Sequence, residues 1–257
     1  LKCTSINMKL LGIGTQKVED IIHEQYPDII IARIDMDTAR NISALTNILE
    51  KFSKGEIHIL IGTQMIAKGL DFDNVTLVGI VNGDTGLFLP DFRSGEKVFQ
   101  LLYQAAGRSG RRRPGEVIIQ TYNPDNPVLK HAAKLDQKTY YNIALSERQE
   151  LNYPPFSWML RIEIQGIKKE HVVTHAEKIK RKLHPSPRGI EILGPANCYR
   201  ERLRGKYRMH IMLKSDKAHD SNGKKLHDYL QKRMSAKLFD SLPSSIKAFV
   251  DVNPVSV

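Results

Sequence analysis

Short apolar runs without a two-residue alternation are separated by helical patterns throughout residues 1–150. Such runs are typical of strands buried on both faces, as in a parallel sheet covered by helices. Strands that alternate with helices in this way predict an α/β layer with a parallel sheet. The predicted strands are residues 9–14, 29–34, 57–61, 75–81 and 116–122, and the predicted helices are one capped by Thr15, residues 43–54, one starting near Ser94, and residues 126–150.

Pro154 and Pro155 interrupt this pattern and mark a domain boundary, because proline ends a helix and has no N–H for sheet pairing. Beyond them, alternating apolar residues and helical spacings follow in the order β-α-β-β-α-β. This order is the split βαβ, or ferredoxin-like, arrangement. We therefore predict an α/β lobe over residues 1–152 and a smaller α+β domain over residues 153–257. The strands predicted here are residues 158–164, 190–193, 207–213 and 248–252, and the helices are residues 172–183 and 226–234.

The net charge of +11 resides in the second half of the chain. Residues 1–150 carry 18 basic and 18 acidic side chains, whereas residues 151–257 carry 21 basic and 10 acidic ones. This asymmetry indicates a polyanionic partner for the second half. Five cations and two tyrosines gather in residues 199–208, which we expect to form a hairpin or loop that binds DNA phosphates and stacks on bases. A solvated charge run is the alternative interpretation. The cations are Arg200, Arg202, Arg204, Lys206 and Arg208.

Composition predicts a cytoplasmic protein without a membrane partner. No apolar run reaches the roughly 18 residues of a membrane span, and no signal-like segment opens the chain. Cys3 and Cys198 are the two cysteines, which is too few for a disulfide scaffold and is consistent with a reducing compartment. Because the first residue is Leu1, we expect this chain to be a piece of a longer protein.

Residues 104–111 read Gln-Ala-Ala-Gly-Arg-Ser-Gly-Arg and close the helix predicted from Ser94. At a helix end, positions three residues apart share a face, so Arg108 and Arg111 can converge on one anion. Arginine binds phosphate bidentately and stabilises the charge that develops during phosphoryl transfer. The alternative is a basic, glycine-rich helix end that faces solvent.

A second block, residues 61–72, follows the predicted strand 57–61 and reads Ile-Gly-Thr-Gln-Met-Ile-Ala-Lys-Gly-Leu-Asp-Phe. Ligands of open α/β sheets bind at the carboxyl ends of strands, where both blocks fall. Asp71 has an alternative interpretation as an ordinary cap or turn aspartate.

The two blocks resemble motifs V and VI of superfamily 2 helicases, which are nucleic-acid-dependent ATPases built from two RecA-like lobes. Residues 33–35 (Arg-Ile-Asp) and 91–96 (Asp-Phe-Arg-Ser-Gly-Glu) extend the resemblance to the primosomal protein N′ family of bacterial replication-restart helicases. The resemblance implies a second RecA-like lobe followed by a DNA-binding domain.

Site residues follow from this resemblance position by position. Arg108 and Arg111 match catalytic arginines that reach ATP phosphates bound on the other lobe, and Gln104 matches the residue that supports them. Position 105 is alanine, where many superfamily members have arginine. Thr63 matches a residue that contacts a DNA phosphate. Gly69 and Asp71 match residues that face the nucleotide.

The resemblance also implies ATP, Mg²⁺ and Zn²⁺ in the full-length protein. The chain contains neither the Gly-x-x-x-x-Gly-Lys-Ser/Thr loop that cradles phosphates nor an Asp-Glu-x-His-like strand end, so we expect it to be inactive alone. Cys3 resembles the last cysteine of a zinc module. Because tetrahedral zinc needs four ligands, we expect no zinc in this chain.

The partners implied are forked or single-stranded DNA, the replication-restart and primosome proteins, and a single-stranded-DNA-binding protein. Two alternatives stay open. One is a repair or recombination helicase of the same superfamily, and the other is a non-catalytic nucleic-acid-binding protein on a RecA-like scaffold.

Overall fold

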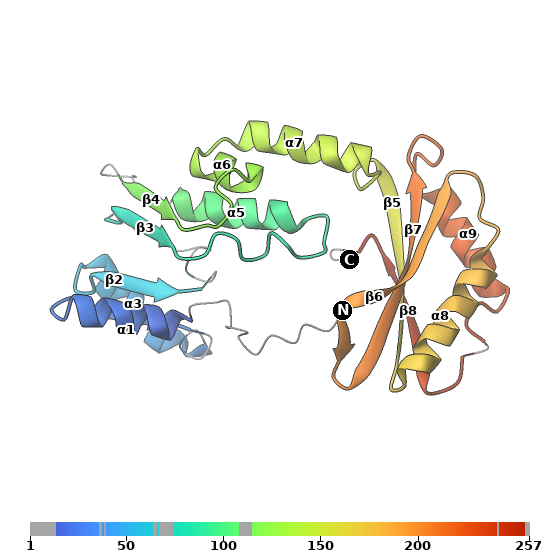
Figure 1. The fold of residues 1–257 in the computed structure, drawn as a ribbon, viewed down its shortest axis with the longest axis horizontal. Helices are drawn as coiled ribbons and strands as arrows, with labels where there is room; N and C mark the ends of the chain where they lie inside the picture. The colour runs from blue at the N-terminus through green and yellow to red at the C-terminus, as the bar shows by residue number, and fades with distance from the viewer. Residues whose placement is uncertain are drawn as a thin grey trace. The chain divides into compact units, whose positions relative to one another are not determined.

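The computed structural model describes residues 14–35, 38, 40–63, 66, 74–107, 115–240 and 242–254. The chain divides into two compact units (Figure 1). The first contains residues up to Phe88 together with Gly95–Tyr140, and the second contains Leu89–Ser94 together with the residues from Tyr141 onward. The short stretch Leu89–Ser94 therefore groups with a part of the chain that is distant in sequence.

In the first unit, the described strands form two parallel pairs. Strand β1 pairs with β2 from Ile31↔Ile59 to Ile34↔Gly62, and β3 pairs with β4 from Leu77↔Glu116 to Ile80↔Ile119. Parallel pairing is what the unalternated apolar runs predict, and it is confirmed for these strands. The elements are α1 (Thr15–Gln25), β1 (Ile31–Ile34), α3 (Ile42–Ser53), β2 (Ile59–Gly62), β3 (Leu77–Ile80), α5 (Ser94–Ala106), β4 (Glu116–Ile119) and α6 (Pro127–Ala133).

Side-chain caps explain where several of these helices begin. The Asn41 side chain accepts a hydrogen bond from the Ala44 N–H at the start of α3, and the Asn126 side chain accepts one from the Val128 N–H at the start of α6. The predicted start at residue 126 is confirmed. The predicted cap by Thr15 is wrong, because extended Gly14 is the N-cap of α1 and Thr15 is already helical.

The single helix predicted over residues 126–150 is also wrong, because the chain forms α6 and then α7 (Gln137–Glu150). Leu135 has a φ of 54°, a left-handed conformation that interrupts a right-handed helix. The Asp136 side chain then accepts a hydrogen bond from the Thr139 N–H at 3.1 Å, which caps the start of α7.

Helix α5 begins at Ser94, as predicted, and buries one face in the first unit. Its buried side chains are Val98, Phe99, Leu102 and Ala106. The Phe99 ring stacks on Tyr140 with ring centroids 4.0 Å apart. This packing fixes the rotation of α5 about its axis and leaves Gln104 in its last turn exposed.

The second unit contains one antiparallel sheet of four described strands, in the order β6-β7-β5-β8. Helices α8 and α9 cover one face of this sheet (Figure 1). Leu160, Ile162 and Ile164 of β5 pack there against Val172, Ala176 and Ile179 of α8. The elements are β5 (Ser157–Gly166), α8 (Lys169–Leu183), β6 (Ile190–Leu203), β7 (Lys206–Asp216), α9 (Lys224–Ser235) and β8 (Ile246–Val252).

Strand β6 is much longer than the predicted strand 190–193, because it continues to Leu203. The sequence Gly194-Pro195 is a turn signal, and Pro195 cannot donate to a sheet ladder. In the structure the pairing with β7 shifts register twice, between Leu193 and Ala196 and between Asn197 and Arg202, and then resumes. These bulges carry the basic segment to the end of the sheet.

Candidate nucleic-acid interface

The basic segment forms the tip of the β6–β7 hairpin. Leu203 pairs with Lys206, so the loop between the strands consists of Arg204 and Gly205. Their φ angles are 49° and 78°, and two successive positive values are typical of a type I′ turn. The turn type holds Arg204 at the outermost position of the hairpin, where it is exposed.

The cations around this turn lie on different faces of the hairpin. Arg202 is directly opposite Tyr207, and its guanidinium carbon lies 5.2 Å from the centre of the Tyr207 ring. Tyr207 packs against the hydrophobic core on the helix side of the sheet, so it is partly a core residue. Lys206 and Arg208 alternate with it and therefore point to the opposite face. Of the two tyrosines, Tyr199 is the exposed one, at 64%.

Arg208 differs from the other four cations because a carboxylate neutralises it. Its Nε and Nη2 atoms each donate a 2.7 Å hydrogen bond to the two carboxylate oxygens of Glu163. This pair lowers the pKa of Glu163 below its usual value, and the nearby Arg161 lowers it further. Within the described part of the chain, Arg200, Arg202, Arg204 and Lys206 have no ion-pair partner, which leaves their charge available to an external anion. Their contact with DNA stays a prediction.

Replacing Glu163 with glutamine is expected to destabilise the fold by about 2–3 kcal/mol at pH 7, because it leaves the half-buried Arg208 without its counter-charge. The folded pKa of Glu163 is depressed, so its stabilisation is present above the unfolded value of about 4.3 and is lost as the pH falls through the folded pKa. Urea unfolding of both proteins at pH 7 and at acid pH measures this, with the difference shrinking in acid. The exposed Glu177→Gln serves as the matched control, and equal stabilities at pH 7 would contradict the assignment.

Thr63 directly follows β2, at the carboxyl end of the parallel pair β1–β2, and is exposed. The strands approach closely here, because a Cβ atom on Gly62 would lie 2.8 Å from the Ile34 carbonyl oxygen. On β1, Arg33 donates to Glu19 at 2.8 Å and to Asp35 at 2.9 Å. Thr63 therefore lies at the carboxyl end of this strand pair, which is where ligands of open α/β sheets bind.

Gln104 is exposed in the last turn of α5, two positions before the helix ends. The other residues predicted for the nucleotide and zinc sites lie outside the described residues, so their arrangement stays a prediction. They are Gly69, Asp71, Arg108, Arg111 and Cys3. Among the residues that the structure describes, no group of three or more His, Cys, Asp or Glu side chains is arranged to hold a metal ion. Burial raises the pKa of the Cys198 thiol to about 11, which suits a structural residue.

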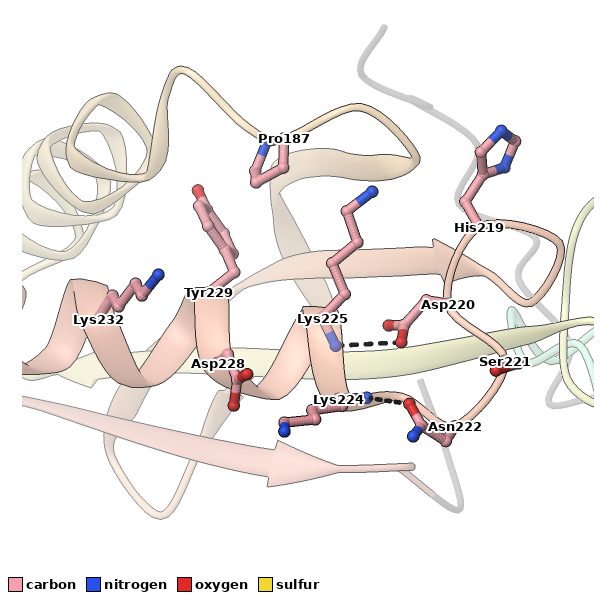
Figure 2. Close-up of a pocket in the computed structure, with 10 residues that line it drawn as sticks. All are labelled: Pro187, His219, Asp220, Ser221, Asn222, Lys224, Lys225, Asp228, Tyr229 and Lys232. Carbon is pink, nitrogen blue, oxygen red and sulfur yellow. Dashed lines mark hydrogen bonds between the residues drawn. The ribbon is translucent and has the colours of Figure 1, made fainter.

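Sequence reasoning missed a pocket of about 540 Å³ at the start of α9 (Figure 2). Its walls come from the connection after α8, the connection after β7 and α9 itself, so only the folded chain brings them together. The Asp220 carboxylate accepts hydrogen bonds from the Lys225 and Leu226 N–H groups, which satisfies the first turn of the helix. The lining residues are Pro187, His219, Asp220, Ser221, Asn222, Lys224, Lys225, Asp228, Tyr229 and Lys232.

Comparison with known proteins gives two family matches in this chain. The primosomal protein N C-terminal domain matches residues 149–255, and the helicase conserved C-terminal domain matches residues 9–113. Replication restart protein PriA of Bacillus subtilis is 40% identical over 215 residues, which cover 83% of this chain and 27% of the relative. The chain belongs to the PriA family.

Other PriA proteins align over nearly the whole chain. The protein from Chlamydia pneumoniae is 36% identical over 258 residues, covering 99% of this chain and 33% of the relative. The protein from Borreliella burgdorferi is 36% identical over 264 residues, covering 100% of this chain and 38% of the relative. This chain thus spans about a third of the length of these PriA relatives. The helicase-domain match identifies a RecA-like α/β lobe in the first part of the chain.

Proposed function

We propose that this chain is the C-terminal part of an ATP-dependent 3′–5′ DNA helicase that restarts replication at stalled forks. In this role it recognises DNA and initiates primosome assembly. The observation that carries the proposal is the presence, in one chain, of a helicase conserved C-terminal domain followed by the primosomal C-terminal domain. The position of the net positive charge in the second domain supports DNA as the ligand.

The first lobe, residues 1–152, would contribute side chains to an ATP site completed by another lobe. Arg108 and Arg111 would reach the phosphates and stabilise charge in the transition state, with Gln104 supporting them. Gly69 and Asp71 would face the nucleotide. Thr63 would bind a DNA phosphate, and its exposure after β2 supports this role.

The second domain, residues 153–257, would be a ferredoxin-like DNA-binding module. The chain order β5-α8-β6-β7-α9-β8 and the antiparallel strand order β6-β7-β5-β8 both support a split βαβ arrangement. Its DNA contacts would come from the hairpin tip, where Arg202, Arg204 and Lys206 surround a tight turn.

The full-length protein would use ATP and Mg²⁺, and it would hold Zn²⁺ in a cysteine module completed by Cys3. Bound ATP supplies the phosphoryl group, and the arginines of this chain would only position and neutralise it. Forked or single-stranded DNA, primosome and replication-restart proteins, and a single-stranded-DNA-binding protein would be its partners in the cytoplasm. No helix among the described residues is both long and apolar enough to cross a membrane.

The 257-residue chain alone is expected to bind ATP at most weakly, because its sequence lacks the phosphate-cradling loop. Calorimetric titration of the chain with ATP and Mg²⁺ checks this, and a stoichiometric, low-micromolar site would contradict it.

The proposal itself is tested with the full-length protein on forked DNA that has a single-stranded 3′ arm. DNA-stimulated ATP hydrolysis with 3′–5′ unwinding is the expected result. Unwinding without a preference for forks would favour a repair or recombination helicase. DNA binding without any ATP hydrolysis would favour a non-catalytic protein on a RecA-like scaffold.

A further inference from the structure

Two aromatic rings and two cations stack together in the second unit. The Phe92 and Tyr153 rings are nearly parallel, with centroids 4.7 Å apart and planes inclined by 5°. The Arg148 guanidinium carbon lies 5.0 Å from the centre of the Phe92 ring, and the Lys214 Nζ lies 3.8 Å from the centre of the Tyr153 ring. We call these four residues the cation–aromatic stack.

Hydrogen bonds hold both cations of the cation–aromatic stack in place. Arg148 Nη1 donates to the Pro154 carbonyl at 2.6 Å, and Lys214 Nζ donates to the Leu151 carbonyl at 3.2 Å. Lys214 lies in β7 and is only 6% exposed. Because backbone carbonyl groups hold both cations over the rings, the cation–aromatic stack belongs to the packed structure of the second unit.

A second contact ties the same segment to the end of the chain. Arg93 Nη1 donates to the Pro254 carbonyl at 3.2 Å, and its guanidinium carbon lies 4.7 Å from the centre of the Phe92 ring. Pro254 follows β8 and is buried. Two neighbouring side chains thus attach Leu89–Ser94 to the second unit at separate places, which explains why this segment groups there.

This anchored segment leads directly into α5. Ser94 is the first residue of the helix and Gln104 lies in its last turn, and the sequence of the predicted arginine motif continues beyond the helix. A helix of 13 residues is about 20 Å long and moves as a rigid element. Its buried face in the first unit leaves it little freedom to twist. Helix α5 is thus the covalent connection between the anchored segment and the residues that carry the arginine motif.

We propose that Phe92 is a positioning residue that couples DNA binding by the second unit to ATP turnover. The anchored segment Leu89–Ser94 moves with the DNA-binding unit, and α5 transmits the movement to Arg108 and Arg111. This inference rests on the proposed function, because it needs both a DNA-binding domain and arginines that act on ATP.

The test uses Phe92→Leu in the full-length protein, because leucine keeps the apolar volume but removes the ring. DNA-stimulated kcat for ATP is expected to fall between about 5- and 150-fold, the usual range of coupling between sites. The KM for ATP, the turnover without DNA and the Kd for DNA are each expected to stay within about twofold of wild type. Phe92→Tyr keeps the stack and is expected to retain the stimulation.

Phe156→Leu is the matched control, because Phe156 lies in the connection that carries Tyr153 but is outside the cation–aromatic stack. It is expected to behave as wild type. A loss of stimulation equal to that of Phe92→Leu would show a general packing effect and would overturn the proposal.

Hydrogen exchange gives a readout that does not depend on ATP. In the 257-residue chain, single-stranded DNA is expected to change the exchange of amides 95–106 in wild type and in Phe92→Tyr, but not in Phe92→Leu. Unchanged exchange in wild type would overturn the coupling, and so would wild-type stimulation in Phe92→Leu. A full-length wild type that binds DNA without hydrolysing ATP would instead remove the proposed function, and this inference with it.

Discussion

Replacing Arg108 or Arg111 with alanine in the full-length protein is expected to lower DNA-stimulated ATP turnover by about 10³-fold or more. The two arginines are three residues apart in the sequence that follows α5, and we expect them to meet one phosphate group and neutralise charge that develops in the transition state. Steady-state ATP hydrolysis at saturating DNA measures the effect. The affinity for DNA is expected to stay within about twofold, because neither arginine is assigned to the DNA site.

Arg113→Ala is the matched control for these variants, because it removes the same charge from the same basic run. It is expected to keep near-wild-type turnover, since we expect Arg112 and Arg113 to form a solvated basic face that does not reach ATP. The double variant of Arg108 and Arg111 is expected to lose little more than either single variant, because residues that act as a unit are not additive. Near-wild-type turnover in both single variants would remove the catalytic assignment.

Elements with strong local signals could be predicted from the sequence. The unalternated run ending at Ile34 predicts a buried parallel strand, and the structure pairs it in parallel with β2. Asn126 followed by Pro127 predicts a helix start, and the Asn126 side chain caps α6. The break after α6 was missed because it depends on a left-handed Leu135, a residue with no sequence signal for that conformation.

The sequence marks the basic segment as a candidate site but does not assign separate roles to its residues. The sequence of residues 199–208 does not distinguish its five cations from one another. In the fold, however, Arg208 pairs with Glu163, 45 residues away, and Tyr207 packs against the core. Such contacts depend on strand register, which a local charge pattern does not contain. For the same reason the stack of Phe92 on Tyr153 joins two segments that no motif connects.

Replacing Arg202, Arg204 and Lys206 together with glutamine is expected to weaken DNA binding strongly and to reduce its salt dependence. Arg204 lies in the two-residue turn, Arg202 and Lys206 lie on either side of it, and none of the three has an ion-pair partner within the described part of the chain. A log-log plot of DNA affinity against salt should have a slope of about −3 to −5 for the wild-type chain, since each neutralised phosphate contributes about −0.7 to −0.9. The triple variant should flatten this slope by about 2–3 units. Arg208 is left unchanged, because its removal would expose Glu163 and confuse stability with binding.

A second triple variant distinguishes phosphate contact from a general loss of positive charge. Lys178, Arg181 and Lys232 are exposed on α8 and α9, and their replacement with glutamine removes the same net charge from the helix side of the unit. Long-range attraction is screened beyond about 10 Å at 0.1 M salt, so this control should lower the affinity only slightly and leave the slope within about one unit of wild type. If both triple variants flatten the slope equally, DNA responds to the overall charge of the unit. If the hairpin variant leaves both affinity and slope unchanged, the basic segment is a solvated face, and phosphates bind elsewhere on the chain.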